Sequence, residues 1–518
     1  MSKNVDGTAG MADTVRAGYA VDGPAVELGA LVVDGKAEPS AGVRIGLSVL
    51  NRHGLVAGAT GTGKTKTLQL MAEQLSAHGV PTFLADIKGD LSGMAVGGEP
   101  NQTITARANE VGQQWQPMAC PVEFLSLGGQ GTGVPVRASI TAFGPVLLSK
   151  VLGLGDVQTS SLGLVFHFAD KAGLPLLDLK DLRAVIQFLV SDEGKADLKG
   201  LGGLSRSTAG VILRELVTFS DAGADVFFGE PEFDTADLLR VGQDGRGIVS
   251  CLELPSVQGQ PVLFSTFLMW LLADLFETLP EVGDVDKPKL VFFFDEAHLL
   301  FRDASKEFLS QIAQTVRLIR SKGVGVVFVT QTSGDVPREV LAQLGSRVQH
   351  ALRAFTPEDA KALKATASTF PTSGYDLEEV LTSVGTGEAV VTVLSERGAP
   401  TPVAWTRMRA PQSLMAPAPE AEVRRIVADS PLLAEYGTAI DRDSAYERLA
   451  AKLAPAPSDA PERPKAQPEA GQRNPDEVSV AERVMASTAF RSFLRSAGTV
   501  LGREITRSVL GTGRRRRR

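Results

Sequence analysis

Short, nearly unbroken apolar runs alternate with longer segments of helical periodicity from about residue 46 onward. Such runs predict buried strands, because a strand that is covered on both faces presents no polar side to water. The predicted strands are His53–Ala57, Val80–Ala85, Gly247–Leu252, Leu290–Phe294 and Val324–Val329. Strands separated by helical segments predict an α/β fold with a mainly parallel sheet and helices on both of its faces.

The pattern changes outside these strands, and the changes predict the domain boundaries. Helical spacing between the second and third predicted strands indicates a helical insertion. A stretch rich in proline, alanine and glutamate has too little apolar surface to fold and indicates a linker. The predicted parts are an N-terminal extension at 1–45 that could form a hairpin, a core at 46–410 with the insertion at about 144–239, a helical C-terminal extension at 411–453, the linker at 454–478 and a basic amphipathic helix with a poly-arginine end at 479–518.

The first predicted strand runs into a glycine-rich loop of the form G-x-x-x-x-G-K-[ST], which a helix follows. Strand, loop and helix in this order predict a P-loop. Glycines let backbone amides approach phosphates closely, and the helix N-terminus adds positive potential. We expect Lys64 to contact the β- and γ-phosphates of ATP and Thr65 to contact Mg²⁺. The expected ATP-binding residues are Gly58, Ala59, Thr60, Gly61, Thr62, Gly63, Lys64 and Thr65.

An acidic pair, Asp295-Glu296, ends the buried strand Leu290–Phe294. In a doubly wound sheet we expect the carboxyl end of this strand beside the P-loop. Asp295 is then placed to hold the Mg²⁺ shell, and Glu296 to accept a proton from the attacking water. An acidic pair can also simply cap the next helix, but a complete P-loop makes the catalytic interpretation the stronger one. The pair predicts ATP hydrolysis.

Polar residues also end two other predicted strands. Gln331 follows the strand at 324–329 and is expected between Glu296 and the γ-phosphate, where its amide could sense or orient water; a plain turn residue is the alternative. The segment Asp86-Ile-Lys88-Gly-Asp90 follows the second strand. Its carboxylates could assist the water or metal network, or could only close a turn, and the sequence leaves both open.

The formal net charge of −7 hides an asymmetry between body and tail. The segment 479–518 holds ten arginines and two glutamates, a net charge of +8, so the rest of the chain carries −15. The apolar stripe of the predicted tail helix contains Phe490, Phe493, Leu494, Ala497, Leu501 and Ile505. Such a helix could bind a nucleic-acid backbone or an anionic membrane surface, or could serve only in oligomerisation or docking.

Two cysteines, Cys120 and Cys251, stand in no metal-ligand spacing, which indicates a reducing compartment. The N-terminus shows no signal-peptide pattern. The longest apolar stretch, Val262–Ala273, is far shorter than the roughly 20 residues that cross a bilayer. We therefore predict a soluble, cytoplasmic protein without a transmembrane segment.

Several of these segments together resemble the HerA/FtsK group of P-loop motor ATPases, and more closely its YjgR-like branch. The resemblance implies a RecA-like core that assembles as a ring, expected to be hexameric, with ATP held between subunits. It covers about residues 45–410, most of the chain. The segments that carry it are Asn51–Thr65, Asp86–Asp90, Leu290–Leu300, Arg317–Gly325, Thr330-Gln331 and Arg347–Arg353.

The resemblance also implies an arginine that enters the neighbouring subunit's site and neutralises transition-state charge. It maps best onto Arg320, with Arg317, Arg347 and Arg353 as alternatives. Arg320 could equally be an exposed helix-end arginine that is favoured by the helix dipole.

Two functions remain open at this point. One is a ring motor that moves DNA, through its pore and with help from the basic tail. The other is an ATP-controlled assembly switch without translocation, which the short N-terminal extension and the missing winged-helix domain of FtsK leave in play. Asp295-Glu-Ala-His298 spells a DEAH box, but the chain after Phe370 is too short and too proline-rich for the second RecA domain of such RNA helicases.

Overall fold

The computed structural model describes residues 3–198, 202–283, 285–302, 304 and 306–453. The predicted linker at 454–478 and the predicted basic helix at 479–518 lie outside the described residues. The strands are β1 (Ala25–Val33), β2 (Lys36–Gly46), β3 (Gly54–Ala57), β4 (Thr82–Asp86), β5 (Val122–Leu127), β6 (Val134–Val136), β7 (Val249–Glu253), β8 (Leu290–Phe294), β9 (Val324–Thr330), β10 (Ser346–Gln349), β11 (Glu388–Thr392) and β12 (Ala404–Met408).

All strands of the described residues belong to one sheet in the order β2-β1-β12-β11-β10-β3-β9-β8-β4-β7-β5-β6. From β10 to β6 every neighbouring pair is parallel. From β2 to β10 the neighbouring pairs are antiparallel. The predicted α/β fold with a mainly parallel sheet is confirmed, and all five predicted strands form in its parallel part.

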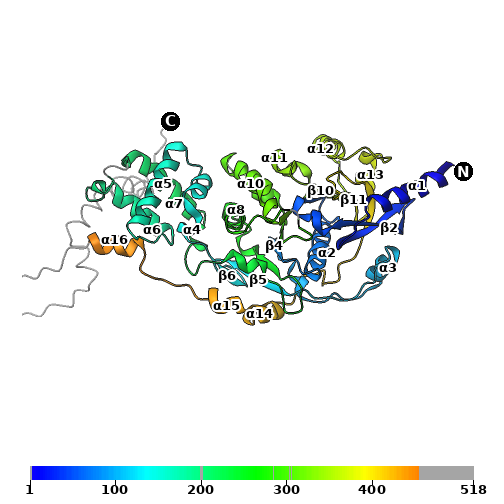
Figure 1. Cartoon of the computed structure of the whole chain (residues 1–518), viewed down its shortest axis with the longest axis horizontal. Coiled ribbons are helices and arrows are strands. Elements are labelled where there is room, and N and C mark those ends of the chain that lie inside the picture. Colours follow the sequence, from blue (N-terminus) through cyan, green and yellow to red (C-terminus); the bar gives the residue numbers. More distant parts are fainter. Residues whose placement is uncertain (1–2, 199–201, 284, 303, 305, 454–518) are drawn as a thin grey trace, which may run out of the picture. The chain divides into compact units, whose positions relative to one another are not determined.

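The longer helices cover both faces of this sheet and fill the connections between its strands (Figure 1). They are α1 (Lys3–Gly18), α2 (Lys64–Ala77), α3 (Gln102–Glu110), α4 (Ile140–Val151), α5 (Asp156–Lys171), α6 (Leu179–Leu189), α7 (Arg206–Asp221), α8 (Pro261–Thr278), α10 (Lys306–Ile319), α12 (Pro357–Ala367), α13 (Leu377–Ser383), α14 (Glu420–Ala428), α15 (Pro431–Tyr436) and α16 (Ala445–Leu453). Two helices of four residues each, α9 (His298–Phe301) and α11 (Arg338–Leu341), follow β8 and β9.

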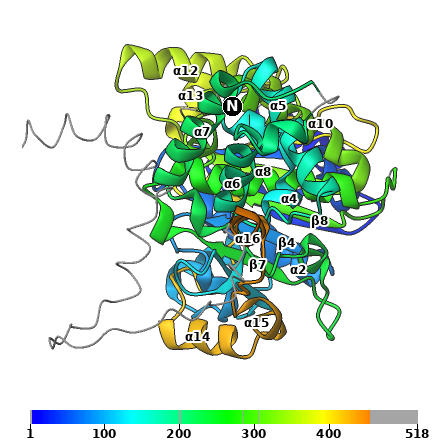
Figure 2. The same ribbon diagram turned by 90° about the vertical axis from the view of Figure 1, so that its left-hand side faces the viewer.

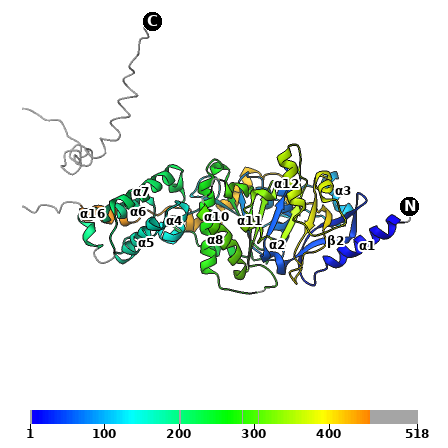
Figure 3. The same ribbon diagram turned by 90° about the horizontal axis from the view of Figure 1, so that it is seen from above.

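The alternation of side chains along β8 shows how both faces are buried. Phe292 and Phe294 pack into the cluster that contains α8 and α10, whereas Val291 and Phe293 pack into the cluster that contains α2 and α14. Successive side chains of a strand point to opposite faces, so an unbroken apolar run is what a strand covered on both sides requires. Figures 1 and 3 show α10 and α11 over the strands, and Figure 1 shows α14 on the other side.

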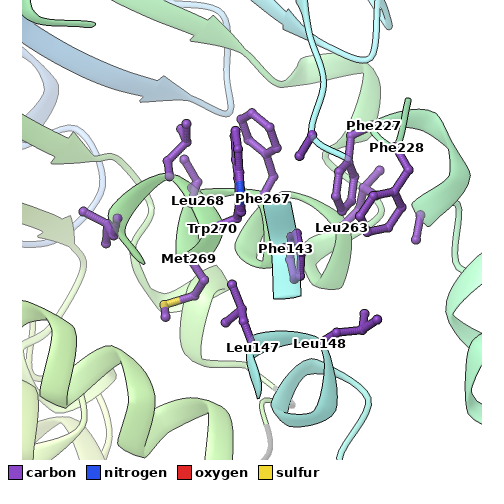
Figure 4. Packing of buried hydrophobic residues seen from close by; sticks show 14 of the residues in the cluster. Phe143, Leu147, Leu148, Phe227, Phe228, Leu263, Phe267, Leu268, Met269 and Trp270 are labelled. Carbon is purple, nitrogen blue, oxygen red and sulfur yellow. The ribbon is translucent and has the colours of Figure 1, made fainter. Parts of the chain in front are cut away.

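The segment between β6 and β7 is helical, with α4, α5, α6 and α7. It joins the main core through aromatic and leucine side chains of α4 and α8, among them Phe143, Leu147, Phe267 and Trp270 (Figure 4). At the other side, α16 packs on α6, where Tyr446 N donates to the Asp181 carboxylate over 2.9 Å. The insertion therefore shares one continuous apolar core with the sheet.

Among the described residues, α8 is the one helix that is long and apolar enough to cross a membrane by length and composition. It extends beyond the apolar stretch seen in the sequence. Within it 61% of the residues are buried inside the protein, and Trp270 and Phe267 are each 1% exposed. This is the environment of a core helix, so the helix is weak evidence for a membrane span.

The N-terminal segment forms the hairpin β1–β2, preceded by a helix, α1, that the sequence did not predict. The hairpin is not a separate appendage, because β1 pairs antiparallel with β12, Gly29 opposite Met408. Tyr19, directly after α1, is 2% exposed and donates its hydroxyl to the carbonyls of Val391 and Pro402. Helix and hairpin thus close the antiparallel end of the sheet.

Figure 2 shows α14 and α15, from the C-terminal extension, below β7 and α2.

Candidate nucleotide-binding site

The carboxyl ends of four parallel strands bring the predicted site residues, apart from Arg320, to one edge of the sheet. In the order β3-β9-β8-β4, the P-loop follows β3, Gln331 follows β9, Asp295 and Glu296 follow β8, and Asp86 ends β4. The strand β9 lies between the P-loop strand β3 and the acidic strand β8. Gln331 therefore occupies the strand end between the P-loop and the acidic pair.

Three glycines give the P-loop its shape. Gly58, Gly61 and Gly63 have φ values of 155°, 80° and 115°, which side chains with a Cβ rarely adopt. A Cβ on Gly58 would lie 2.5 Å from the Cβ of His350, so only glycine fits there. The loop is tied to the sheet because Ala59 N donates to Ala351 O over 2.8 Å.

Lys64 is the first residue of α2, so its side chain and the amides of the first helical turn both lie at the P-loop. Its Nζ donates to Ala59 O over 3.2 Å. Burial lowers the pKa of Lys64, while the carboxylates of Glu296 and Asp295 favour the charged ammonium. Thr65 stands next to it on the first turn of α2, half-buried. The helix N-terminus, the glycine loop and the ammonium make an anion site that fits a polyphosphate.

Asp295 is buried, with 2% exposure, and only one of its carboxylate oxygens has a hydrogen-bond donor among the described residues. Oδ1 accepts from Glu296 N over 2.9 Å, and Oδ2 has no partner there. Burial, with the nearby Glu296 carboxylate, raises the pKa of Asp295 to about 7. A buried carboxylate oxygen without a donor suits a divalent cation, whose charge would restore the ionised form. The residues therefore fit Mg²⁺.

Glu296 is also buried, with 6% exposure, and its backbone takes the unusual φ of 47°. Lys88 Nζ forms an ion pair with Glu296 Oε1. His298 Nδ1 lies 3.2 Å from the other oxygen, Oε2, without the geometry of a hydrogen bond. The left-handed backbone and the ion pair with Lys88 limit the directions that the carboxylate can take. Beyond placing Lys88 at a neighbouring strand end, no pattern in the sequence pointed to its contact with Glu296.

The segment after β4 is a tight turn closed by Asp86. Its carboxylate accepts backbone N–H groups from Lys88, Gly89 and Leu91 at 3.2, 2.7 and 2.8 Å. Burial raises the pKa of Asp86 to about 6. Of the two interpretations that the sequence left open, the turn-closing one is therefore what the contacts of Asp86 show.

His350, which follows β10, packs against Gly58 of the P-loop and contacts α2. No pattern in the sequence identified this residue. It is 0% exposed. Its Nε2 lies 2.9 Å from the hydroxyl of Thr67 on α2, and its Nδ1 lies 2.8 Å from Glu388 O on β11. Since a carbonyl only accepts, Nδ1 carries the proton and Nε2 accepts from Thr67. Burial lowers the pKa of His350 to about 4, so the ring is neutral.

The side chain of Gln331 is exposed, and the backbone carbonyl of this residue accepts from Gly58 N over 3.1 Å. Arg320 is exposed as well, but it precedes β9 and lies at the edge opposite the P-loop. The seven residues of β9 span roughly 20 Å, so Arg320 cannot serve the site of its own subunit. Arg317 on α10 shares that edge, whereas Arg353 follows β10 on the P-loop edge.

These features define a P-loop ATPase with a RecA-like core: a P-loop, an acidic pair at the end of a separate strand, and a strand with a polar end between the two. ATP and Mg²⁺ are the cofactors of this class. The family described as helicase HerA-like C-terminal matches residues 32–518, and the chain belongs to this family.

Curated relatives are distant in sequence. The chain is 20% identical over 353 residues to the DNA double-strand break repair helicase HerA of Sulfolobus acidocaldarius, covering 67% of this chain and 64% of that relative. It thus spans somewhat less than two thirds of that relative's length. It is 20% identical over 378 residues to the HerA of Saccharolobus solfataricus, covering 72% and 67% of the two chains.

Among solved structures, the bacterial conjugative coupling protein TrwBdeltaN70 superimposes with a TM-score of 0.52 at 15% identity, covering 79% of this chain and 94% of that one. The plasmid coupling protein TrwB in complex with the ATP analogue ADPNP gives a TM-score of 0.51 at 16% identity, covering 77% and 98%. At this identity the likeness shows the fold alone.

Proposed function

We propose that this protein hydrolyses ATP with Mg²⁺ and uses the energy as a ring-forming motor that acts on DNA in the cytoplasm. The observation that carries the hydrolysis is the pair of buried carboxylates at the end of β8. Asp295 presents an oxygen without a donor among the described residues, and Glu296 is held by its ion pair with Lys88. Both stand on the same sheet edge as Lys64.

Each residue of this edge has a defined task in the proposal. The amides of residues 58–65 and Lys64 bind the phosphates, and Thr65 and Asp295 hold Mg²⁺, which supplies positive charge to the leaving and transferred phosphates. Glu296 accepts the proton of the attacking water, and Gln331 orients that water from the neighbouring strand end. Arg320, at the opposite edge, supplies its charge to the site of the next subunit in a ring, which we expect to be a hexamer.

DNA as the substrate is supported by the names of the curated relatives and by the +8 segment at 479–518. The remaining part of the chain is acidic, with a net charge of −15, which favours a second candidate. In that alternative the same ATPase cycle switches a protein assembly and moves no nucleic acid. The arginine-rich segment could then contact an anionic membrane surface.

DNA stimulation of ATP turnover separates the two candidates. Turnover is measured with and without linear duplex DNA at low salt, with Lys64→Ala as the matched inactive protein. A motor is expected to hydrolyse ATP several-fold faster with DNA, because translocation couples ATP hydrolysis to movement along the DNA. Turnover that is unchanged by DNA, together with no DNA binding, would remove the motor and leave the switch. Absence of any turnover in the intact protein would refute both.

A further inference from the structure

We propose that Lys88 senses the terminal phosphate of the nucleotide by exchanging its ammonium between Glu296 and the γ-phosphate. The inference rests on the proposed ATPase function and assigns a positioning residue to it. Lys88 would hold the catalytic carboxylate when no γ-phosphate is bound, and would release it when one arrives.

The first support is the difference in burial between the two partners. The side chain of Glu296 is 8% exposed, whereas that of Lys88 is 40% exposed. The ammonium therefore reaches Glu296 from the solvent side of the site. A lysine in this position can leave the pair without any backbone movement, since it has four rotatable side-chain bonds and an open path.

The second support is that the base of this side chain is fixed. The Asp86 carboxylate accepts three backbone N–H groups of the turn that carries Lys88. Gly89 has a φ of 74°, and a Cβ there would lie 3.1 Å from Pro255. The turn therefore fixes the backbone of Lys88, and only the flexible end of the Lys88 side chain can change its partner.

The third support is the charge around the ammonium. Burial opposes the charged form of Lys88, but the carboxylates of Glu296, Asp295 and Asp90 outweigh it and raise the pKa of this lysine. Two of the same carboxylates, Glu296 and Asp295, also favour the charged form of Lys64. A γ-phosphate placed between two lysines would carry more negative charge than one carboxylate and would therefore attract Lys88 more strongly.

Burial and backbone geometry explain why Glu296 would stay in place when Lys88 leaves. Its side chain is 8% exposed, and the His298 ring lies beside it, with Nδ1 3.2 Å from Oε2, the oxygen that Lys88 does not contact. The φ of 47° at Glu296 also limits where the carboxylate can point. Departure of Lys88 would therefore expose Oε1 as a proton acceptor without disordering the side chain. The base would become available only when there is a γ-phosphate to hydrolyse.

Nucleotide affinity tests this without relying on turnover. Binding of Mg²⁺·ADPNP and of Mg²⁺·ADP to the full chain is measured by calorimetry for Lys88→Met. We expect a loss of about tenfold for ADPNP, since one charged contact to the γ-phosphate disappears, and a change within about twofold for ADP. Lys88→Arg keeps the cation and is expected to keep most of the preference for ADPNP.

A double-mutant cycle adds the competition between the two partners. Glu296→Gln removes the competing carboxylate, so ADPNP should bind several-fold more tightly than to the wild type. In Lys88→Met/Glu296→Gln this gain should disappear. Lys180→Met is the matched control, because Lys180 pairs with Asp178 over 3.3 Å on the surface of the insertion.

Equal losses for ADPNP and ADP in Lys88→Met, or no loss, would overturn the inference and leave Lys88 as a fixed partner of Glu296. So would a gain from Glu296→Gln that persists without Lys88. The proposed function fails separately, if the wild-type protein binds nucleotide but never hydrolyses ATP.

Discussion

Replacing His350 tests how the P-loop is supported by the buried end of β10. The ring contacts Thr67 through Nε2 and Glu388 O through Nδ1, and it is 0% exposed. His350→Asn keeps a donor for the carbonyl of Glu388 but leaves the hydroxyl of Thr67 without an acceptor. A buried group left unpaired costs about 1–3 kcal/mol, so we expect the variant to be roughly 2 kcal/mol less stable at about pH 7.5.

The same substitution should cost much less stability in acid. Burial lowers the pKa of His350 from 6.5 to about 4. Between these values the unfolded chain binds a proton that the folded protein excludes, so this group makes stability fall as the pH falls below about 6.5. At about pH 4.5 the folded wild type loses roughly 2.5 kcal/mol through this histidine, and His350→Asn does not. The stability difference should therefore shrink to near zero.

Urea denaturation of wild type and His350→Asn, followed by tryptophan fluorescence at about pH 7.5 and about pH 4.5, measures this difference. Other buried groups, such as His53 with a pKa lowered to about 4 and Glu73 with a pKa raised to about 7 by burial, are present in both proteins and cancel. His167→Asn, an exposed histidine on α5, is the matched control. A stability difference that is the same at both pH values would refute the assignment of His350 as a neutral, doubly hydrogen-bonded brace.

Three further predictions concern the loop, the ring and the tail. Gly58→Ala should weaken binding of a fluorescent ATP analogue at least about tenfold, because its Cβ would meet His350 at 2.5 Å, whereas Gly163→Ala, with no atom within 4 Å of the new Cβ, should not. Arg320→Ala and Glu296→Gln should each be inactive alone, and mixing them should restore ATP turnover; no recovery in a mixture shown to co-assemble would exclude Arg320 from the neighbour's site. Deleting residues 479–518 should weaken duplex DNA binding and flatten its salt dependence while ATP turnover persists, and unchanged DNA binding would place the contact elsewhere.

The parallel part of the fold was predictable because the pattern that identifies each of its strands lies within that strand's own sequence. Leu290–Phe294 and Val324–Thr330 are unbroken apolar runs that only a strand covered on both faces can use, and the P-loop pattern identifies the loop and the helix after β3. The antiparallel end was not predictable in the same way. β1 is joined to β12, from the far end of the core sequence, and no periodicity within either strand identifies its partner.

The site shows the same division. The common edge for residues 58–65, Asp295 and Glu296 could be predicted from the sequence, since each follows a recognisable strand. The contacts of His350 and Lys88 were not predicted because their partners lie far away in the sequence: Thr67 is 283 residues away from His350, and Glu296 is 208 residues away from Lys88.

ATP binding and ATP turnover of Glu296→Gln, compared with Lys64→Ala and the wild type, test the central claim most directly. Glu296→Gln should bind Mg²⁺·ATP at least as tightly as the wild type and hydrolyse it at least about 100-fold more slowly, because an amide cannot accept the proton of the attacking water. Lys64→Ala should lose binding, because the phosphates lose their fixed ammonium. A Glu296→Gln protein that hydrolyses ATP at the wild-type rate would contradict the assignment of the carboxylate at the end of β8 as the catalytic base.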